Sequence, residues 1–96
     1  MKPSTALNKH RASIRRIVES HRAVNARVFG SVVHGDDNED SDLDILIDPI
    51  ATTSLMDVAA IQVELELLLG VKVDVLTPRA LPDHFRTAVL AEALPI

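Results

Sequence analysis

Residues 42–48 have the sequence DLDILID, which is the most informative segment of the chain. Apolar residues occupy every second position from 43 to 47, and this period of two predicts a β-strand with one buried face. Pro49 ends the predicted strand. Because Asp42 and Asp44 stand two residues apart, both carboxyl groups leave the same face of the strand, with α-carbons about 6.5 Å apart. Aspartate is depleted in strands, so the pair is a candidate for chemistry.

The sequence on either side of this stretch predicts helices and strands in alternation. Ser54 followed by Asp57 has the spacing of a capping box and predicts a helix start, and Gly70 predicts its end. The elements that we expect, in chain order, are a helix over 4–22, a strand over 24–29, a helical turn over 31–34, a strand over 42–48, a helix over 54–69, a strand over 71–76 and a helix over 82–93. This order predicts an α/β chain with a small sheet covered by helices.

A third aspartate, Asp74, lies between two valines in the strand expected over 71–76. If this strand neighbours the strand over 42–48, three carboxylates converge, and they repel one another unless a cation lies between them. Hard oxygen ligands of this kind select Mg²⁺ or Mn²⁺. The alternative gives each aspartate a structural role: Asp42 as a turn residue, Asp44 facing solvent, and Asp74 paired with Lys72 or Arg79.

Gly30 and Ser31 follow the strand expected over 24–29 and precede the predicted helical turn. Backbone N–H groups at such a junction, with a serine hydroxyl as a further donor, form a site for an anion such as a phosphate. Glycine also allows the backbone to approach a phosphate closely. Taken alone, Gly-Ser is most often only a turn. Here ten residues separate Ser31 from Asp42, and the second aspartate follows at Asp44.

Length and composition limit the function classes. The 96 residues predict one domain, 1–96. No apolar run is long enough for a membrane span, there is no cysteine and therefore no disulfide framework, and we expect a cytoplasmic protein. The net charge of −4 argues against general binding to nucleic acid. Charge is unevenly distributed, with a basic N-terminal segment and an acidic segment over 36–48.

The combination of Phe29-Gly30-Ser31, Asp42-Leu43-Asp44-Ile45 and Val73-Asp74-Val75 resembles the signature of the polymerase-β-type nucleotidyltransferase superfamily. The short chain is similar to its minimal nucleotidyltransferase (MNT) branch. The resemblance implies an α+β core, namely a small mixed sheet with helices packed on one side.

The resemblance also implies roles for individual residues. Gly30 and Ser31 would hold the triphosphate of ATP. Asp42 and Asp44 would bind two Mg²⁺ ions, with Mn²⁺ as a substitute, and Asp74 would bind one of them and draw the proton from the acceptor hydroxyl. Some relatives carry Arg at the position of His34, so this chain departs from the family pattern at that residue. The alternative to a role in triphosphate binding is that His34 is an ordinary exposed histidine.

Many minimal members of this superfamily are antitoxins encoded beside a HEPN-domain ribonuclease toxin. The resemblance implies that this chain transfers AMP from ATP to a hydroxyl, most often of Tyr, on such a toxin. The alternative is a catalytically silent antitoxin that neutralises the toxin by binding alone. A nucleotidyltransferase acting on a small molecule or on RNA would need a further domain, and a DNA-binding role would rest only on the N-terminal arginines.

Overall fold

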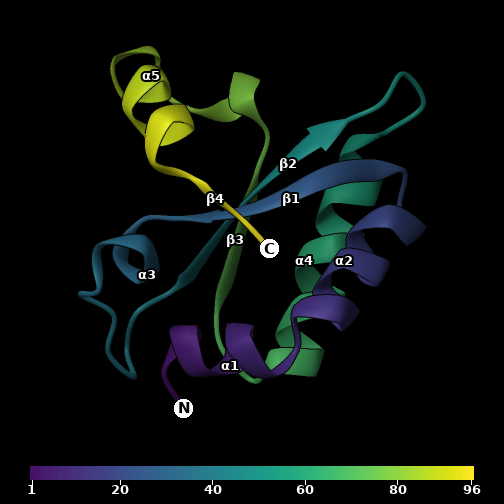
Figure 1. Ribbon diagram of the computed structural model, residues 1–96. Coiled ribbons are helices and arrows are strands. Elements are labelled where there is room, and N and C mark those ends of the chain that lie inside the picture. The colour runs from purple at the N-terminus through teal and green to yellow at the C-terminus, as the bar shows by residue number, and fades with distance from the viewer.

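The computed structural model describes residues 1–96, which fold around a four-stranded mixed sheet with the strand order β3-β2-β1-β4 (Figure 1). The strands are β1 (Ala23–Phe29), β2 (Leu43–Pro49), β3 (Val73–Leu76) and β4 (Leu94–Pro95). β1 pairs antiparallel with both β2 and β4, whereas β2 and β3 run parallel. The small mixed sheet implied by the resemblance is therefore confirmed.

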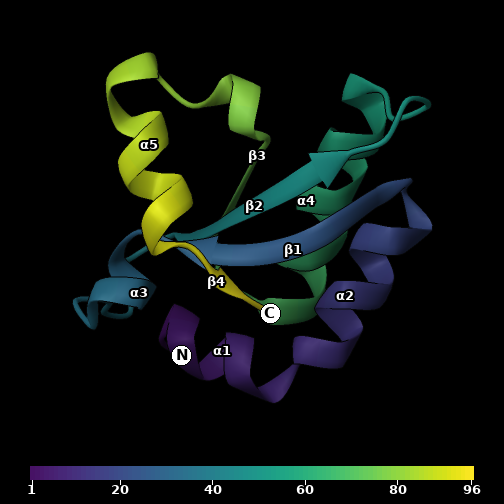
Figure 2. The ribbon, with the colours of Figure 1, turned by 45° about the horizontal axis from the view of Figure 1, so that its top comes forward.

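Three helices cover one face of the sheet: α1 (Pro3–Lys9), α2 (Arg11–Ser20) and α4 (Leu55–Leu69) (Figure 2). The core lies between these helices and the sheet, and includes Ile14, Ile45 and Ile61, all fully buried. The capping box at the start of α4 is present, with Ser54 accepting from the Asp57 amide, and Gly70 ends the helix in a left-handed conformation. No helix combines the length and the apolarity that crossing a membrane requires.

The predicted helix over 4–22 is wrong as a single element, because the chain bends at His10, where φ is −129°, and forms α1 and α2. Each segment buries its own apolar residues, among them Leu7 in α1 and Val18 in α2, so the bend lets both reach one core. β4 was not expected from the sequence. Its two residues carry no periodicity, and pairing with Arg27 and Val28 alone defines it as a strand.

The remaining helical segments lie apart from this layer. They are α3 (Ser31–His34), the 3-10 turn η1 (Pro78–Ala80) and α5 (Asp83–Glu92). α3 is the predicted helical turn. α5 contains no buried residue and stands clear of α1, α2 and α4 (Figure 2). Arg86 of α5 donates hydrogen bonds to the backbone around η1 and so attaches the helix there.

Candidate active site

Asp44 and Asp74 lie directly opposite each other on neighbouring parallel strands. The register of β2 with β3 pairs Leu43 with Val73, Asp44 with Asp74 and Ile45 with Val75. The adjacency that the sequence left conditional is therefore present. Because side chains alternate along a strand, the two carboxylates share the face opposite to the one that Leu43 and Ile45 bury against the helices.

Asp42 immediately precedes β2 and approaches Asp74 from the strand end. The two side chains are within hydrogen-bonding reach of each other. The pairing of Asp74 with Lys72 or Arg79, which is the alternative to a metal-binding role, is not among the ion pairs of the structure. The carboxylates therefore lie close to one another, and the charge of Lys72 offsets only part of the resulting rise in the pKa of Asp74.

Gly30 brings the end of β1 against the carboxylate of Asp44. Phe29 is the partner of Asp44 in the β1–β2 register, and Gly30 follows with a φ of +75° before α3 begins at Ser31. A β-carbon on residue 30 would overlap Oδ2 of Asp44 and lie 3.2 Å from its Cγ. Only glycine fits this position without displacing the carboxylate or straining the backbone.

The electrostatics of the site favour binding of a cation. Burial of the Asp44 carboxyl, together with the charges of Asp74 and Asp42, raises its pKa to about 6. The pKa of Asp74 is also raised, first by partial desolvation and then by the charge of, and a hydrogen bond with, Asp42. Asp74 nevertheless stays exposed to solvent, so desolvation affects it less than the half-buried Asp44. Ionised together, these groups repel each other.

The donor set fits Mg²⁺ or Mn²⁺ better than a softer metal, because carboxylate oxygens are the ligands that these ions prefer. No three Asp, Glu, His or Cys side chains stand close enough together to hold one ion by themselves. The structure thus pairs Asp44 with Asp74 and Asp42 with Asp74 without building a closed three-ligand cage. Mg²⁺ commonly binds one or two carboxylates and takes its remaining ligands from water and substrate phosphates, which matches this arrangement.

Two carboxylates of the acidic segment over 36–48 have structural roles instead. Asp37 accepts a hydrogen bond of 2.9 Å from the backbone N–H of Ser4 in the first turn of α1, and this bond holds the pKa of Asp37 below its usual range. Asp48 binds Arg27 at 2.5 Å. These carboxylates tie the segment to α1 and β1, so they are not part of the cluster.

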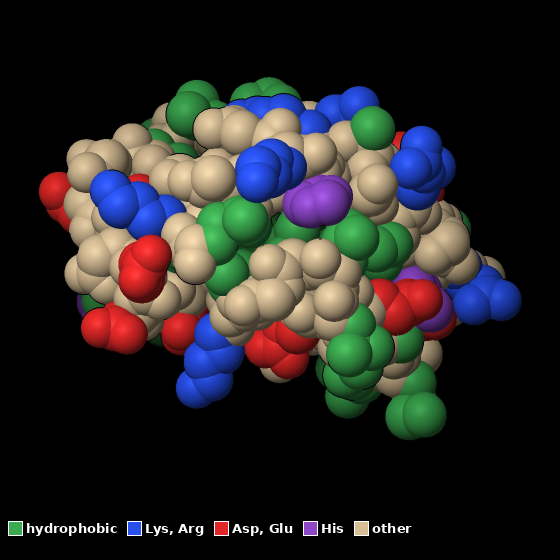
Figure 3. Space-filling model, turned by 90° about the horizontal axis from the view of Figure 1, so that it is seen from below, with side chains coloured by type: hydrophobic (Ala, Val, Ile, Leu, Met, Phe, Trp, Pro, Cys, Tyr) green, Lys and Arg blue, Asp and Glu red, His purple; other side chains and the backbone are tan.

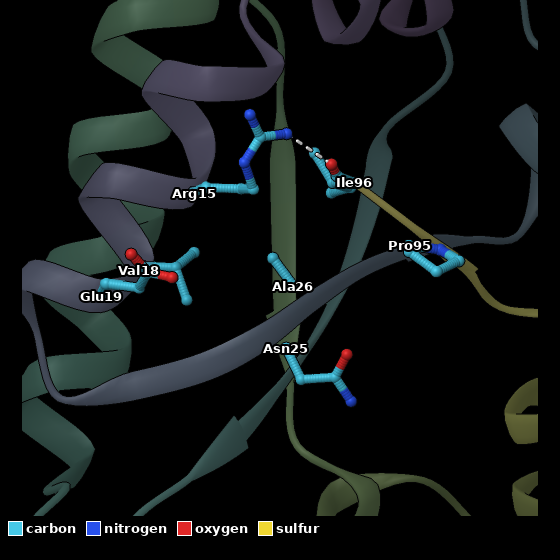
Figure 4. Close-up of a pocket in the computed structure, with 7 residues that line it drawn as sticks. All are labelled: Arg15, Val18, Glu19, Asn25, Ala26, Pro95 and Ile96. Carbon is cyan, nitrogen blue, oxygen red and sulfur yellow. Dashed lines mark hydrogen bonds between the residues drawn. The ribbon is translucent and has the colours of Figure 1, made fainter.

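The carboxylates lie on an open surface. One hollow, about 220 Å³ in volume, lies between α2 and the β1–β4 edge, where Arg15 binds the Ile96 carbonyl oxygen at 2.7 Å (Figure 4). Neither it nor the two other hollows is lined by Asp42, Asp44 or Asp74. Geometry and charge, rather than concavity, therefore identify the candidate site, and its open form leaves room for a large second substrate.

One contact near the site was not anticipated. His34, at the end of α3, binds Glu92 of α5 at 2.7 Å, with both side chains about half exposed. The contact links the segment after Gly30 and Ser31 to α5 across 58 residues of sequence. No local pattern signals such a pair, since it depends on where α5 lies.

Comparisons with known proteins agree with this geometry. The family model described as "Nucleotidyltransferase domain" matches residues 7–96. A Methanocaldococcus jannaschii protein that carries the provisional name protein adenylyltransferase is 33% identical over 90 residues, which cover 94% of this chain and 97% of that protein.

Two solved structures share the fold. One, of a provisionally assigned minimal nucleotidyltransferase, has a TM-score of 0.87 and 42% identity and covers 100% of this chain and 97% of its own. The other, a toxin–antitoxin structure with AMP-PNP, has a TM-score of 0.74 at 19% identity and covers 88% of this chain and 69% of its own. At that identity the second likeness concerns the fold alone.

Proposed function

The chain belongs to the nucleotidyltransferase domain family, and from this premise we propose that it is an antitoxin that transfers AMP from ATP to a hydroxyl group of a HEPN-family toxin. The observation that carries the proposal is the placement of Asp44 opposite Asp74 on adjacent parallel strands. Residues 1–96 are proposed to form one catalytic domain. The names of the relatives, which include protein adenylyltransferase and toxin–antitoxin, support the same reading.

Each residue of the cluster has a role in the proposed reaction. Asp42 and Asp44 would hold two Mg²⁺ ions, which when bound would neutralise the phosphate charge and stabilise the pyrophosphate that leaves as AMP is transferred. Gly30 and Ser31 would support the triphosphate, because the glycine brings the backbone next to Asp44. Asp74 would accept the proton of the attacking hydroxyl, a role that its raised pKa favours.

The position of Asp74 supports a protein as the acceptor. Asp74 is exposed, lies on the edge strand of the sheet, and is enclosed by no hollow. A tyrosine hydroxyl presented by another protein could therefore approach it without a channel. The open surface implies that the partner excludes water from the reaction when it binds.

Exposed apolar side chains support a stable contact with a protein partner. Met56 is 80% exposed and Leu67 81% exposed on α4, and Phe85 is 53% exposed on α5. Figure 3 shows hydrophobic side chains projecting together at one corner of the molecule, whereas acidic side chains gather mainly on the side of α3. Apolar surface of this kind commonly marks a protein interface.

The alternative function is a silent antitoxin that neutralises the toxin by covering it. The loss of folding stability that the carboxylate cluster causes argues against a silent antitoxin. Burial and the charges of Asp74 and Asp42 raise the pKa of Asp44, and burial and Asp42 raise the pKa of Asp74, so ionisation of these carboxyl groups destabilises the folded chain at neutral pH. A chain that acts by binding alone would gain stability by replacing either residue.

Intact-mass spectrometry of the toxin distinguishes the two functions. The purified chain is incubated with a HEPN partner, ATP and Mg²⁺, and the ribonuclease activity of the toxin is followed in parallel. We expect the toxin to gain the mass of one or more AMP units as its activity falls. Neutralisation without any gain in mass would establish the silent antitoxin instead.

A further inference from the structure

β3 is an edge strand of only four residues, and it carries Asp74 in its middle. One side of β3 pairs with β2, and its other side has no partner strand. N–H groups alternate in direction along a strand, so those of Val73 and Val75 point together toward the unpaired edge. An edge strand needs other partners for such groups.

Two side chains of α4 supply these partners. The Val73 N–H donates to Oε2 of Glu66 at 3.0 Å, and the Val75 N–H donates to Oε1 of Gln62 at 3.4 Å. Gln62 and Glu66 are four residues apart, so they stand one helical turn from each other on the same face of α4. The backbone of β3 is therefore fixed to one rigid helix immediately before and immediately after Asp74.

The anchoring opposes a specific force. Like charges directly opposite each other across neighbouring strands destabilise the pairing, and Asp44 faces Asp74 in this way. Of the two strands, β2 lies inside the sheet between β1 and β3, whereas β3 has a free side. Repulsion is therefore relieved most easily by outward movement of β3, which would carry Asp74 away from Asp44.

We propose that Gln62 and Glu66 act as a two-point clamp that positions Asp74 for AMP transfer. The proposal rests on the proposed function and deepens it, since the clamp acts through Asp74 and contacts no substrate. A carboxylate at residue 66 makes a charge-assisted and therefore stronger hydrogen bond to the Val73 amide than a neutral acceptor would. If Gln62 and Glu66 served only to satisfy the N–H groups of the edge strand, the position of Asp74 would not depend on them.

The test compares Glu66→Ala, which removes the acceptor, with Glu66→Gln, which keeps an oxygen at the same place. Glu64→Ala is the matched control, because Glu64 lies on the same helix but binds His21 instead of β3. For Glu66→Ala we expect kcat of AMP transfer to fall about tenfold or more, since small displacements of a reacting group are costly, with KM for ATP within about twofold. Glu66→Gln should restore most of the rate, and the control should retain it.

A double-mutant cycle separates positioning from general loss of structure. If Glu66 acts through Asp74, Glu66→Ala should cause no further loss of Mn²⁺ affinity in a chain that already carries Asp74→Asn. Additive losses would overturn the proposal, as would a Glu66→Ala variant with unchanged kcat or a Glu66→Gln variant as slow as Glu66→Ala.

If the unmodified chain shows no AMP transfer, the proposed function is wrong. The clamp is then tested separately, by the affinity of the chain for Mn²⁺ alone. Glu66→Ala should weaken Mn²⁺ binding severalfold and Glu66→Gln should restore it, because a displaced Asp74 contributes less to the ligand set. Equal Mn²⁺ affinity in all three chains would overturn the clamp.

Discussion

Gly30 and Asp44 are in such close contact that a β-carbon on residue 30 would overlap Oδ2 of the aspartate and lie 3.2 Å from its Cγ. The contact fixes the end of β1 against the carboxylate whose pKa is raised most clearly, to about 6. The segment that would support a triphosphate and the group that would bind a metal are thus one packed unit. A substitution at Gly30 should therefore displace the carboxylate of Asp44, and a substitution at Asp44 should alter the packing against Gly30.

The first prediction tests this contact with two glycines. Gly30 and Gly35 both have a φ of +75°, but a β-carbon at Gly35 would meet no atom within 4 Å. Gly35→Ala places alanine in the left-handed helical region (φ 75°, ψ 18°) at a cost of about 1 kcal/mol. Gly30→Ala is strained more, because its ψ of −143° lies where essentially only glycine is found, and it alone also displaces Asp44. Urea unfolding should show the larger loss for Gly30→Ala, and calorimetry should show that it alone loses ATP binding. Equal effects of the two substitutions would contradict the contact.

The second prediction concerns the pH dependence of stability. The pKa of Asp44 rises from 3.8 to about 6 on folding. Between these values the folded chain binds more protons than the unfolded chain, so the free energy of unfolding falls as pH rises through this window. Asp44→Asn should therefore stabilise the metal-free chain at pH 7 by about 1–2 kcal/mol, an amount reduced for partial exposure.

The gain from Asp44→Asn should shrink toward zero near pH 4, where the carboxyl group of the unmodified chain is protonated in the folded state. Urea unfolding at the two pH values measures it. Asp40→Asn, which changes an exposed aspartate of the loop after α3, is the control and should change stability little. A gain at Asp44 that is independent of pH would show that charge is not its cause.

The third prediction is that Mg²⁺ with ATP raises the melting temperature, because a ligand that binds only the folded state stabilises it. A chain with both Asp42→Asn and Asp44→Asn should remain folded, since repulsion is relieved, and should lose this shift. Thermal unfolding with and without Mg²⁺ and ATP is the measurement. A double variant that responds as the unmodified chain does would place the binding site elsewhere.

The sequence predicted the parts of the fold that depend on local patterns. The alternation over 42–48 and the capping box at Ser54 are local, and both features are present. The break at His10 is not a local feature, because neither proline nor glycine marks it, and it follows from how α1 and α2 pack on one core.

The same distinction applies to the site. The spacing of Asp42 and Asp44 is visible in the sequence, whereas the register that sets Asp74 opposite Asp44 depends on strand pairing. The contact of Gly30 with Asp44 and the contacts of Gln62 and Glu66 with β3 also join distant segments. A family resemblance indicates which residues form the candidate site, but only the three-dimensional structure shows which contacts position them.

The fourth prediction concerns the attachment of α5, which has no buried residue. Arg86 donates to the carbonyl oxygens of Pro78 and Leu81, each at 2.8 Å. Arg86→Ala should accelerate amide hydrogen exchange throughout α5, and Arg86→Lys should restore little, because lysine lacks the planar fork. The exposed Arg79→Ala is the control. Slow exchange in α5 of Arg86→Ala would show that other contacts hold the helix.

If the carboxylate cluster catalyses AMP transfer, Asp74→Asn should remove the reaction without removing ATP binding. Intact-mass spectrometry follows AMP addition to the HEPN partner over time, while calorimetry measures ATP affinity of the same variant. We expect AMP addition to be nearly abolished while ATP affinity changes little, because the proton acceptor is lost and the triphosphate contacts remain. AMP addition at the unmodified rate would contradict this role of the cluster.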